Sequence, residues 1–366
     1  MSERRPIIAV PVSNEADRLS DCLHALTHQH GDCNQTVLVL VNNSSDASDA
    51  VAHCFAATSP VPVLVENVEL SPDDANAGGA RRFVMQRAEE LAGDNGVLLT
   101  TDADGRVALD WLQANLRAID AGADAVAGRV AVDPIEEALI PRHLRLADAD
   151  ECAYANLLDT IEGHIDPDPA DPLPRHDEHS GASMAVTVAA FRAAGGIPRM
   201  PVGEDRAFFN LLRRIDARIR HAPDVWVTVS GRIDGRAAGG MADTIRRRMS
   251  CPDAFLDDRL EPVADFVARI HLRRQLKERW VQTALARASV ATLARDLQLA
   301  PSLIEQALTL PFFGAAWHVI ETQSPALRRR RVAVSTVMQE SLRAREILAK
   351  LDPAAEAVEP PLTMTA

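Results

Sequence analysis

Several features that define large classes of proteins are scarce in this chain of 366 residues. Aromatic residues make up only 4% of it, so a core must be built mainly from Ala, Val, Leu and Ile. The five cysteines form no Cys-x-x-Cys pair, which argues against a disulfide framework or a zinc site. This cysteine usage fits a reducing compartment, and we expect a cytoplasmic protein.

Long hydrophobic runs are also absent. No apolar stretch reaches the roughly 18 residues that a membrane-spanning helix requires. The first apolar run is interrupted by Pro11 and does not resemble a secretory signal peptide. The sequence therefore predicts no transmembrane segment, and it leaves peripheral contact with a membrane open.

Positive charge is outnumbered, with 39 Lys and Arg against 52 Asp and Glu, a net charge of −13. This balance argues against a general nucleic-acid binder, whose affinity depends on clustered basic residues. Residues 288–308 have the spacing of a helix-turn-helix, but only Arg295 is basic within them, so DNA binding is the least favoured function. The run Arg328–Arg331 is interpreted as a solvated helix face, or as a contact for an acidic partner or anionic lipid.

Apolar strand patterns alternate with helical patterns along the first two thirds of the chain. Strands are expected at 6–12, 36–41, 61–65, 96–101, 123–130, 184–188, 217–221 and 225–229. Several of these runs are apolar on both faces, which is typical of a mainly parallel sheet covered by helices. The sequence therefore predicts an α/β fold with a Rossmann-like central sheet and flanking helices.

No strand pattern follows residue 244. Amphipathic helical patterns run over 262–287, 288–308 and 326–350. We therefore expect two domains, an α/β domain over 1–243 and an all-helical C-terminal extension over 244–366 whose last residues are frayed.

The most informative stretch is the strand that ends in Thr101-Asp102-Ala103-Asp104-Gly105. Side chains two residues apart on a strand point the same way, so Asp102 and Asp104 present two carboxylates together. Open α/β sheets bind ligands at the carboxyl ends of their strands, and Mn²⁺ or Mg²⁺ bridging a diphosphate suits two hard oxygen ligands. A plain Asp/Gly turn with solvated carboxylates is the alternative for this motif taken alone.

Six short motifs in a fixed order resemble a family-2-type glycosyltransferase with the GT-A fold, of the nucleotide-diphospho-sugar transferase superfamily. The resemblance covers roughly residues 5–230 and rests on Val10-Pro11-Val12-Ser13-Asn14-Glu15, Val41-Asn42-Asn43-Ser44-Ser45-Asp46, Asn76-Ala77-Gly78-Gly79-Ala80-Arg81, Thr101-Asp102-Ala103-Asp104, Gly181-Ala182-Ser183 and Gly203-Glu204-Asp205. It implies a metal-dependent hexosyltransferase that moves a sugar from a nucleotide-diphosphate donor to a hydroxyl acceptor.

By this resemblance, the donor is held by residues at several strand ends. The first strand end supplies Pro11, Ser13 and Glu15, and the second supplies Asn43, for the base and ribose. Family members usually carry Asp-Asp where this chain has Asn42-Asn43, which leaves the identity of the base open.

The resemblance and the charge pattern also suggest how the diphosphate is held. Arg81 is expected to reach a phosphate, Asp104 to ligate Mn²⁺ or Mg²⁺ directly, and Asp102 to contact the ribose or support the metal through water. Arg232 and Arg236 lie in a Gly-rich segment and are suggested as anion clamps, because Arg pairs bidentately with phosphate. A solvated helix residue is the alternative for Arg81, and a flexible surface loop is the alternative for the two clamps.

Asp205 corresponds to the family's general base, which takes the proton of the acceptor hydroxyl and leads to inversion at the anomeric carbon. Glu204 is expected to orient Asp205 or the acceptor. The alternative for this pair is a helix start enriched in acids.

Other functions on the same fold remain open at this point. A retaining transferase differs only in how Asp205 faces the donor. A nucleotidyltransferase is disfavoured because the first strand is followed by an acidic segment and not by a Gly-rich basic loop, and a non-catalytic donor-binding protein is a further alternative. The C-terminal helices are expected either to cap the acceptor site or to mediate homodimerisation. No motif identifies the acceptor.

Overall fold

The computed structural model describes residues 4–31, 33–233, 235, 239–281 and 287–352, with the backbone alone for 287–289. The chain forms two compact units, each built from separate stretches of sequence. The first comprises residues 1–142, 178–252 and 311–315, and the second comprises residues 143–177, 253–310 and 316–366.

The first unit is organised around one eight-stranded sheet with strand order β3-β2-β1-β4-β7-β6-β8-β5. The strands are β1 (Arg5–Val12), β2 (Thr36–Asn42), β3 (Val63–Val68), β4 (Gly96–Thr100), β5 (Arg106–Val107), β6 (Ala125–Val132), β7 (Met184–Thr187) and β8 (Ile219–Val229). Parallel pairing joins β3, β2, β1 and β4 in one block and β6 to β8 in another, whereas β7 runs antiparallel between the two blocks. The prediction of an α/β fold with a mainly parallel sheet is thereby confirmed.

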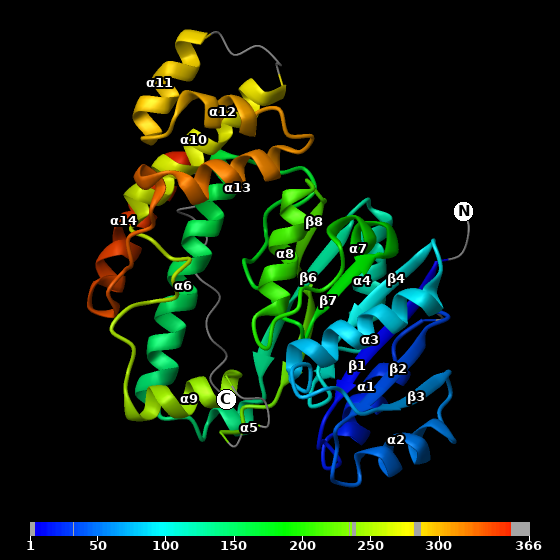
Figure 1. The fold of residues 1–366 in the computed structure, drawn as a ribbon. Helices are drawn as coiled ribbons and strands as arrows, with labels where there is room; N and C mark the ends of the chain where they lie inside the picture. Colours follow the sequence, from blue (N-terminus) through cyan, green and yellow to red (C-terminus); the bar gives the residue numbers. More distant parts are fainter. Residues whose placement is uncertain (1–3, 32, 234, 236–238, 282–286, 353–366) are drawn as a thin grey trace. The chain divides into compact units, whose positions relative to one another are not determined.

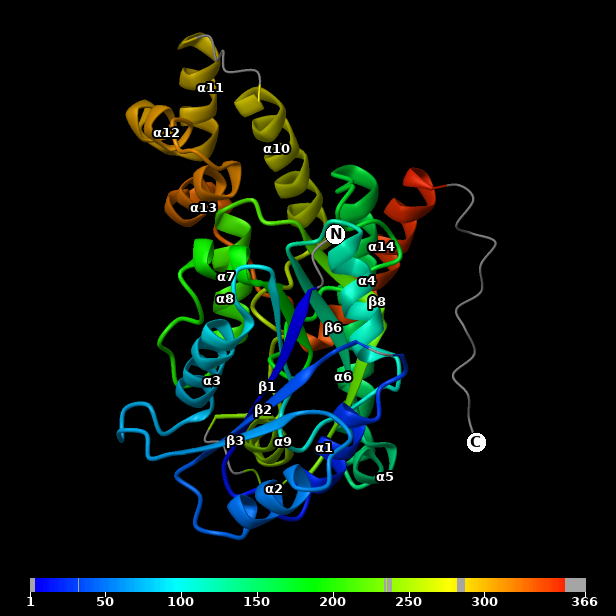
Figure 2. The same cartoon turned by 90° about the vertical axis from the view of Figure 1, so that its right-hand side faces the viewer.

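Helices cover both faces of this sheet. Those of the first unit are α1 (Leu19–Thr27), α2 (Ser48–Ala56), α3 (Ala77–Ala92), α4 (Trp111–Asp120), α5 (Pro134–Glu137), α7 (Val188–Ala194), α8 (Glu204–Arg214) and α9 (Met241–Ser250). In Figure 2, α3 lies on one side of β1 and β2, and α1 and α2 lie on the other. Because β1, β2 and β4 run parallel, their carboxyl ends lie at the same edge of the sheet.

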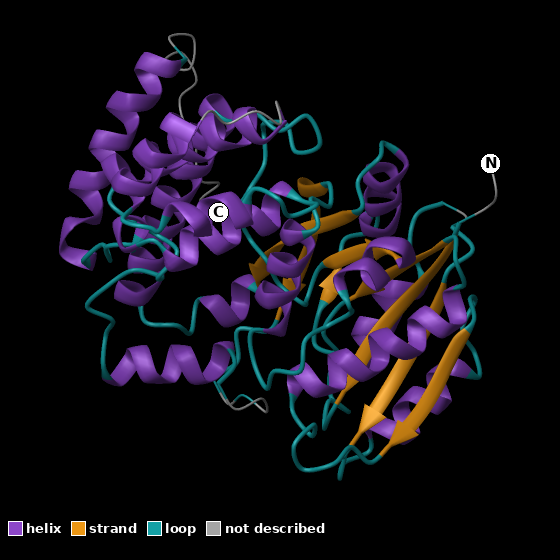
Figure 3. Cartoon of the chain, turned by 45° about the horizontal axis from the view of Figure 1, so that its top comes forward, coloured by secondary structure: helices purple, strands orange, loops and turns teal. Residues whose placement is uncertain are grey.

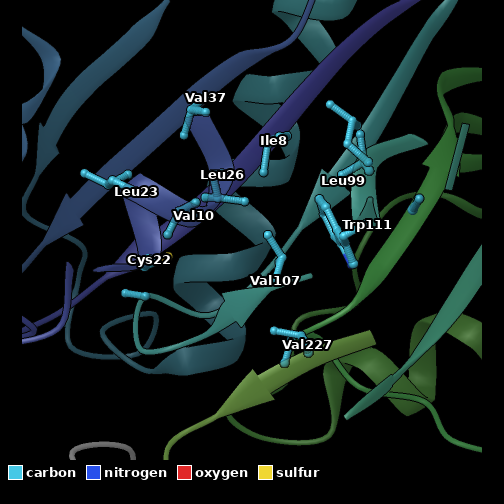
Figure 4. Packing of buried hydrophobic residues seen from close by; sticks show 14 of the residues in the cluster. Ile8, Val10, Cys22, Leu23, Leu26, Val37, Leu99, Val107, Trp111 and Val227 are labelled. Carbon is cyan, nitrogen blue, oxygen red and sulfur yellow. The ribbon is translucent and has the colours of Figure 1, made fainter. Parts of the chain in front are cut away.

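Alternating side chains on the central strands build two separate cores. Ile8 and Val10 of β1 pack with α1 and α4, as Figure 4 shows around Cys22, Leu26 and Trp111. Their neighbours on β1 point to the opposite face, where α3, α7 and α8 contribute Met85, Phe191 and Phe208 among others. This period-2 division explains why the strand sequences are apolar on both faces.

Strand β8 differs from the expectation of two short strands over 217–221 and 225–229. It is one strand, and its pairing with β6 shifts register between Gly128 and Arg129. Ala222 pairs with Gly128 and Trp226 with Arg129, so three residues including Pro223 are taken up as a bulge. Proline removes a ladder hydrogen bond, and the bulge lets the strand continue past it.

The second unit is helical in its regular elements (Figure 3). It contains most of α6 (Arg142–Ile165) and α13 (Phe313–Gln323), together with α10 (Val263–Val281), α11 (Arg287–Leu297), α12 (Pro301–Ala307), the short 3-10 turns η1 (Pro325–Leu327) and η2 (Val334–Thr336), and α14 (Val337–Leu351). Its core joins Tyr154, Leu158 and Ile161 of α6 to Leu256, Leu260 and other residues from the C-terminal third. Helices α9 and α13 had no counterpart in the sequence prediction (Figure 1).

The run Arg328–Arg331 is not a solvated helix face, because this stretch follows η1 as an extended segment. Arg329 and Arg330 pair with Glu321 and Asp265, and Arg331 lies over the ring of Phe255 with its guanidinium carbon 4.4 Å from the ring centre. Three of the four arginines are therefore engaged within their own unit. Among the described helices, none is both long enough and apolar enough to cross a membrane.

A buried hydrogen bond between Trp111 and Ser183 provides a test of the first core. The indole Nε1 donates to Ser183 Oγ at 2.9 Å, and both residues are almost fully buried. Ser183→Ala leaves the indole N–H without an acceptor, and we expect it to lower the free energy of unfolding by about 1–3 kcal/mol in chemical denaturation. Trp111→Phe combined with Ser183→Ala should cost less than the sum of the two single substitutions.

Ser20→Ala, at an exposed position of α1, is the matched control and should change stability by less than about 0.5 kcal/mol. Equal stabilities for Ser183→Ala and Ser20→Ala would contradict the assigned role of this hydrogen bond.

Candidate active site

The loops that follow β1 and β2 are tied together by short polar side chains. The backbone N–H groups of Asn14 and Glu15 donate to Ser44 Oγ at 3.1 Å and to Ser48 Oγ at 2.8 Å. In return, Asn14 Oδ1 accepts the N–H of Ser45 at 2.8 Å. Asn14 has a φ of 55°, in the left-handed region that Asn tolerates better than most residues. The sequence Ser-Asn-Glu after the strand thus fixes where Glu15 is presented.

Arg81 of α3 is the centre of a buried polar network with an exposed fraction of 5%. Its Nε donates to Glu204 Oε1 at 2.8 Å, and its Nη2 donates to Asp102 Oδ1 at 2.5 Å. Its Nη1 donates to Thr100 Oγ1 and to the carbonyl of Gly181, both at 2.9 Å. A side chain at position 181 would place its Cβ 2.3 Å from the guanidinium carbon, so only glycine allows this approach.

Arg232 holds a second group of carboxylates. Its Nη1 donates to Glu15 Oε2 at 2.8 Å, its Nη2 also contacts Glu15, and Nη2 lies 3.2 Å from Asp104 Oδ2. The start of this loop is fixed by Glu136 of α5, which accepts hydrogen bonds from Ser230 Oγ at 2.8 Å and from the N–H of Gly231 at 2.6 Å. Each carboxylate of the Asp-x-Asp motif is therefore paired with a different arginine.

Asp205 stands in the first turn of α8, beside the network of Arg81. The helix begins after Gly203, whose φ of 78° lies in the left-handed region. Asp205 Oδ2 accepts the N–H of Gly181 at 2.8 Å, which holds its carboxylate against the loop that leads into β7. Glu204, directly before it, is 4% exposed and turns inward to Arg81. The two adjacent acids thus differ, because Glu204 is buried and ion-paired whereas Asp205 is partly exposed.

The electrostatics of this edge favour a cation. Four carboxylates (Glu15, Asp102, Asp104 and Glu204) against two guanidinium groups (Arg81 and Arg232) leave a formal charge of −2. Burial and the neighbouring Asp102 carboxylate raise the pKa of Asp104 to about 6. Both observations describe a site where added positive charge relieves repulsion.

The donor set also suits a particular kind of cation. Asp102 and Asp104 offer oxygen ligands, which Mg²⁺ and Mn²⁺ prefer. Within the described ranges, no group of three or more His, Cys, Asp or Glu is arranged to hold a metal ion. Two carboxylates with the remaining positions open fit a cation that is completed by substrate phosphates.

The remaining residues predicted for the site lie as follows. Pro11 is within β1 and opposite Leu40 of β2, and Ser13 is partly exposed just beyond the strand. Asn43 has a φ of 45°, and its amide exchanges two hydrogen bonds with the backbone of Leu70, at 3.0 and 3.1 Å. Arg236 falls outside the described residues. The structure brings together Glu15, Arg81, Asp102, Asp104, Glu204, Asp205 and Arg232, and it directs Arg81 and Asn43 to protein groups.

Sequence reasoning missed several supporting residues. Thr100 and Asn14 have contacts described above, and Glu136 also accepts a hydrogen bond from Arg18 Nη2 at 2.7 Å. Asn14 had a usable signal, because Asn in the turn that follows a strand tolerates a left-handed conformation. Glu136 lies 94 residues before Ser230 in sequence, and nothing local to it indicates that contact.

An open sheet with β1, β2 and β4 parallel, in which β4 is followed by an acidic motif paired with arginines, is the architecture of an α/β domain of the GT-A type. Residues 7–183 match the family model for glycosyl transferase family 2. The chain therefore contains a glycosyl transferase family 2 domain, and it is a glycosyltransferase. No curated protein matches the chain in sequence.

Among solved structures, the chain is similar to three transferases. S. aureus TarS 1–349 in complex with UDP-GlcNAc has 15% identity over 94% of this chain and 90% of that one, with a TM-score of 0.48. The mannosyltransferase PcManGT from Pyrobaculum calidifontis, in complex with GDP-Man and Mn²⁺, has 16% identity over 98% and 76%, with a TM-score of 0.44. Glucosyl-3-phosphoglycerate synthase from Mycobacterium tuberculosis has 14% identity over 75% and 80%, with a TM-score of 0.37.

The Arg81–Glu204 pair can be measured by a double-mutant cycle. Arg81→Met leaves the Glu204 and Asp102 carboxylates without their guanidinium, and we expect it to cost about 3–5 kcal/mol of stability. Combining it with Glu204→Gln should recover part of that loss, because the fully buried unpaired charge is removed. Unfolding by urea followed by circular dichroism measures each variant.

Arg82→Met on the same helix is the matched control. Arg82 contacts Asp74 at 3.1 Å with 24% of its side chain exposed, so its loss should cost about 1 kcal/mol or less. A cost for Arg81→Met no larger than that for Arg82→Met would argue against a central role of the network.

Proposed function

We propose that this protein transfers a sugar from a nucleotide-diphosphate donor to a hydroxyl acceptor, with a divalent cation and with inversion at the anomeric carbon. The single observation that carries the proposal is the position of two carboxylate–arginine groups at the ends of β1 and β4 beside Asp205. This arrangement supports a cation–diphosphate site at these strand ends, with Asp205 beside it as the proposed proton acceptor.

Asp104 and Asp102 would hold the cation, Mn²⁺ or Mg²⁺, together with the diphosphate oxygens. When bound, the cation neutralises the negative charge that develops on the diphosphate leaving group. Arg232 is proposed to contact the diphosphate as well, because its guanidinium already lies 3.2 Å from Asp104. Arg236 is proposed for the same role on sequence position alone.

Arg81 is better suited to positioning than to binding phosphate. Its four N–H···O contacts with the protein occupy most of its donors and hold Asp102 and Glu204 in place. Glu204 then contributes indirectly, because its carboxylate holds the guanidinium of Arg81 in place. We propose that the base and ribose of the donor bind at the ends of β1 and β2, where they contact Pro11, Ser13, Glu15 and Asn43.

Asp205 is the proposed general base. The Gly181 N–H fixes one of its oxygens at 2.8 Å, and its partial exposure allows an acceptor hydroxyl to approach. It takes the hydroxyl proton while the acceptor oxygen attacks the anomeric carbon from the face opposite the leaving diphosphate.

We further propose that residues 1–243 form the catalytic domain and that the helical part over 244–366 serves the acceptor or a second copy of the chain.

The donor site is tested by isothermal titration with UDP, GDP, dTDP and ADP, each with and without Mn²⁺. We expect one diphosphate to bind, with an affinity that falls by about tenfold or more without Mn²⁺ or in Asp104→Asn. In both cases the bound cation is lost, so nothing offsets the repulsion between the diphosphate and the remaining carboxylates. Asp110→Asn, an exposed carboxylate at the start of α4, is the control and should bind as the wild type does. Failure of all four diphosphates to bind a folded protein would exclude this donor site.

The general base is tested separately by following release of nucleoside diphosphate from the matching nucleotide sugar, with water as the acceptor. Asp205→Asn should lower this rate by about 10²- to 10⁴-fold. Donor affinity should stay unchanged, since Asn Oδ1 can still accept the Gly181 N–H. Asp224→Asn, an exposed carboxylate with a weak contact to Arg117 at 3.2 Å, is the control. An unchanged rate in Asp205→Asn would assign the proton transfer elsewhere, and a product with retained anomeric configuration would contradict inversion.

A further inference from the structure

The second unit contains a cavity of about 820 Å³, and none of the residues that line it is assigned a role in the proposed transfer reaction. This volume lies in the range of about 300–1,000 Å³ that is typical of small-molecule sites. One wall is a single face of α10 from Asp265 to Arg279, and the others are α11 and the segment 326–330. The fourteen residue steps from Asp265 to Arg279 correspond to a rise of about 21 Å along an α-helix, so the cavity is elongated.

The walls of this cavity are fixed to one another. Arg269 Nη2 donates to the carbonyl of Leu327 at 2.8 Å, which ties α10 to the segment after η1. Arg330 pairs with Asp265 at 2.6 Å across the same two elements. Ser324 Oγ donates to the carbonyl of Leu297 at 2.7 Å and ties α11 to the start of η1. The cavity is therefore preformed by hydrogen bonds that do not depend on a ligand.

The charges in the cavity are only partly neutralised by these contacts. Arg269 is 6% exposed and is bound by Glu261 through two hydrogen bonds, at 2.7 and 2.8 Å. Arg330 is paired with Asp265. The other two arginines of the lining, Arg279 and Arg328, have no ion pair or side-chain hydrogen bond with any described residue. The third acid of the lining, Asp296, is exposed and lies 3.5 Å from Arg295.

Between these charges the lining is mainly aliphatic, with six residues: Ala268, Leu272, Leu293, Leu297, Ala326 and Leu327. It also includes two uncharged polar residues, Gln275 and Thr292. An elongated site that combines an aliphatic lining with two uncompensated guanidinium groups is complementary to a molecule with an apolar body and an anionic group. A purely apolar ligand would leave both arginines unpaired, and a small inorganic anion would leave the leucines uncovered.

We propose that this cavity binds an amphiphilic organic anion, held by Arg279 and Arg328 through its carboxylate or phosphate and by the leucines through its aliphatic part. This site is separate from the residues assigned to sugar transfer, and the proposal does not depend on that function.

The experiment uses the full chain and the fluorescent aryl sulfonate 1-anilinonaphthalene-8-sulfonate as a probe, in competition with decanoate, decyl phosphate and uncharged decanol below their aggregation concentrations. We expect saturable probe fluorescence that decanoate or decyl phosphate displaces at least tenfold more effectively than decanol. Whichever acid competes better identifies the anionic group as carboxylate or phosphate.

Two sets of variants make the result specific. Arg279→Gln with Arg328→Gln should weaken probe binding by about tenfold or more, because two charge-assisted hydrogen bonds are lost. Arg345→Gln with Lys350→Gln removes the same charge from exposed positions of α14 and should bind as the wild type does. Ala268→Trp, at an exposed position of the lining, should block the cavity and leave the far-ultraviolet circular dichroism unchanged.

Equal probe affinity in the wild type, in the Arg279/Arg328 variant and in Ala268→Trp would overturn the proposal, as would displacement by decanol that equals displacement by the acids. Nucleoside diphosphate binding is measured on the same variants and should not change. The outcome for this cavity is thereby independent of the outcome for the donor site.

Discussion

The buried guanidinium of Arg81 is the interaction on which the proposed active site depends. It joins α3, the end of β4, the loop before β7 and the start of α8 through four hydrogen bonds. These segments lie up to 123 residues apart in sequence, and three of them carry proposed functional residues: Arg81 in α3, Asp102 and Asp104 after β4, and Glu204 and Asp205 at the start of α8. A buried arginine needs carboxylates around it, and carboxylates in this position need an arginine, so neither set can be replaced alone without a large loss of stability.

In this arrangement, the carboxylate oxygens that fix the structure differ from those proposed to bind the metal and to accept the proton. Glu204 and one oxygen of Asp102 are bound to Arg81, whereas Asp104 lies 3.2 Å from Arg232 and Asp205 is partly exposed with one oxygen bound to the Gly181 N–H. The charge of −2 left at this edge is a cost of the fold in isolation and becomes an advantage once a cation and a diphosphate are bound. Such local conflict between stability and charge is typical of functional sites.

The positions of most strands along the chain, and the elements that carry the motifs, could be predicted because they depend on local patterns. Apolar runs with both faces buried gave β1, β2 and β4, and Asp102 and Asp104 follow directly from the end of β4. The partners of these residues could not be predicted, since Arg81 with Glu204 and Arg232 with Glu15 are contacts between distant parts of the chain. Arg81 was expected on a phosphate because its sequence neighbours, two glycines at a helix start, do not indicate that it points inward. The bulge in β8 was missed for a related reason: a proline breaks a local strand pattern, and only pairing with β6 shows that the strand continues.

The helical unit is assembled from three stretches of chain, which has a practical consequence for anyone who wishes to study the catalytic part alone. The apolar face of α6 that carries Tyr154, Leu158 and Ile161 finds its partners in residues 256–263 and 332–344. A protein shortened at residue 243 would keep that face and lose everything that covers it. Such a fragment is expected to aggregate, because its apolar face is exposed. A separate catalytic domain would therefore also need α6 replaced by a short polar connection between residues 142 and 178. The two units therefore cannot be separated by cutting the chain at a single position.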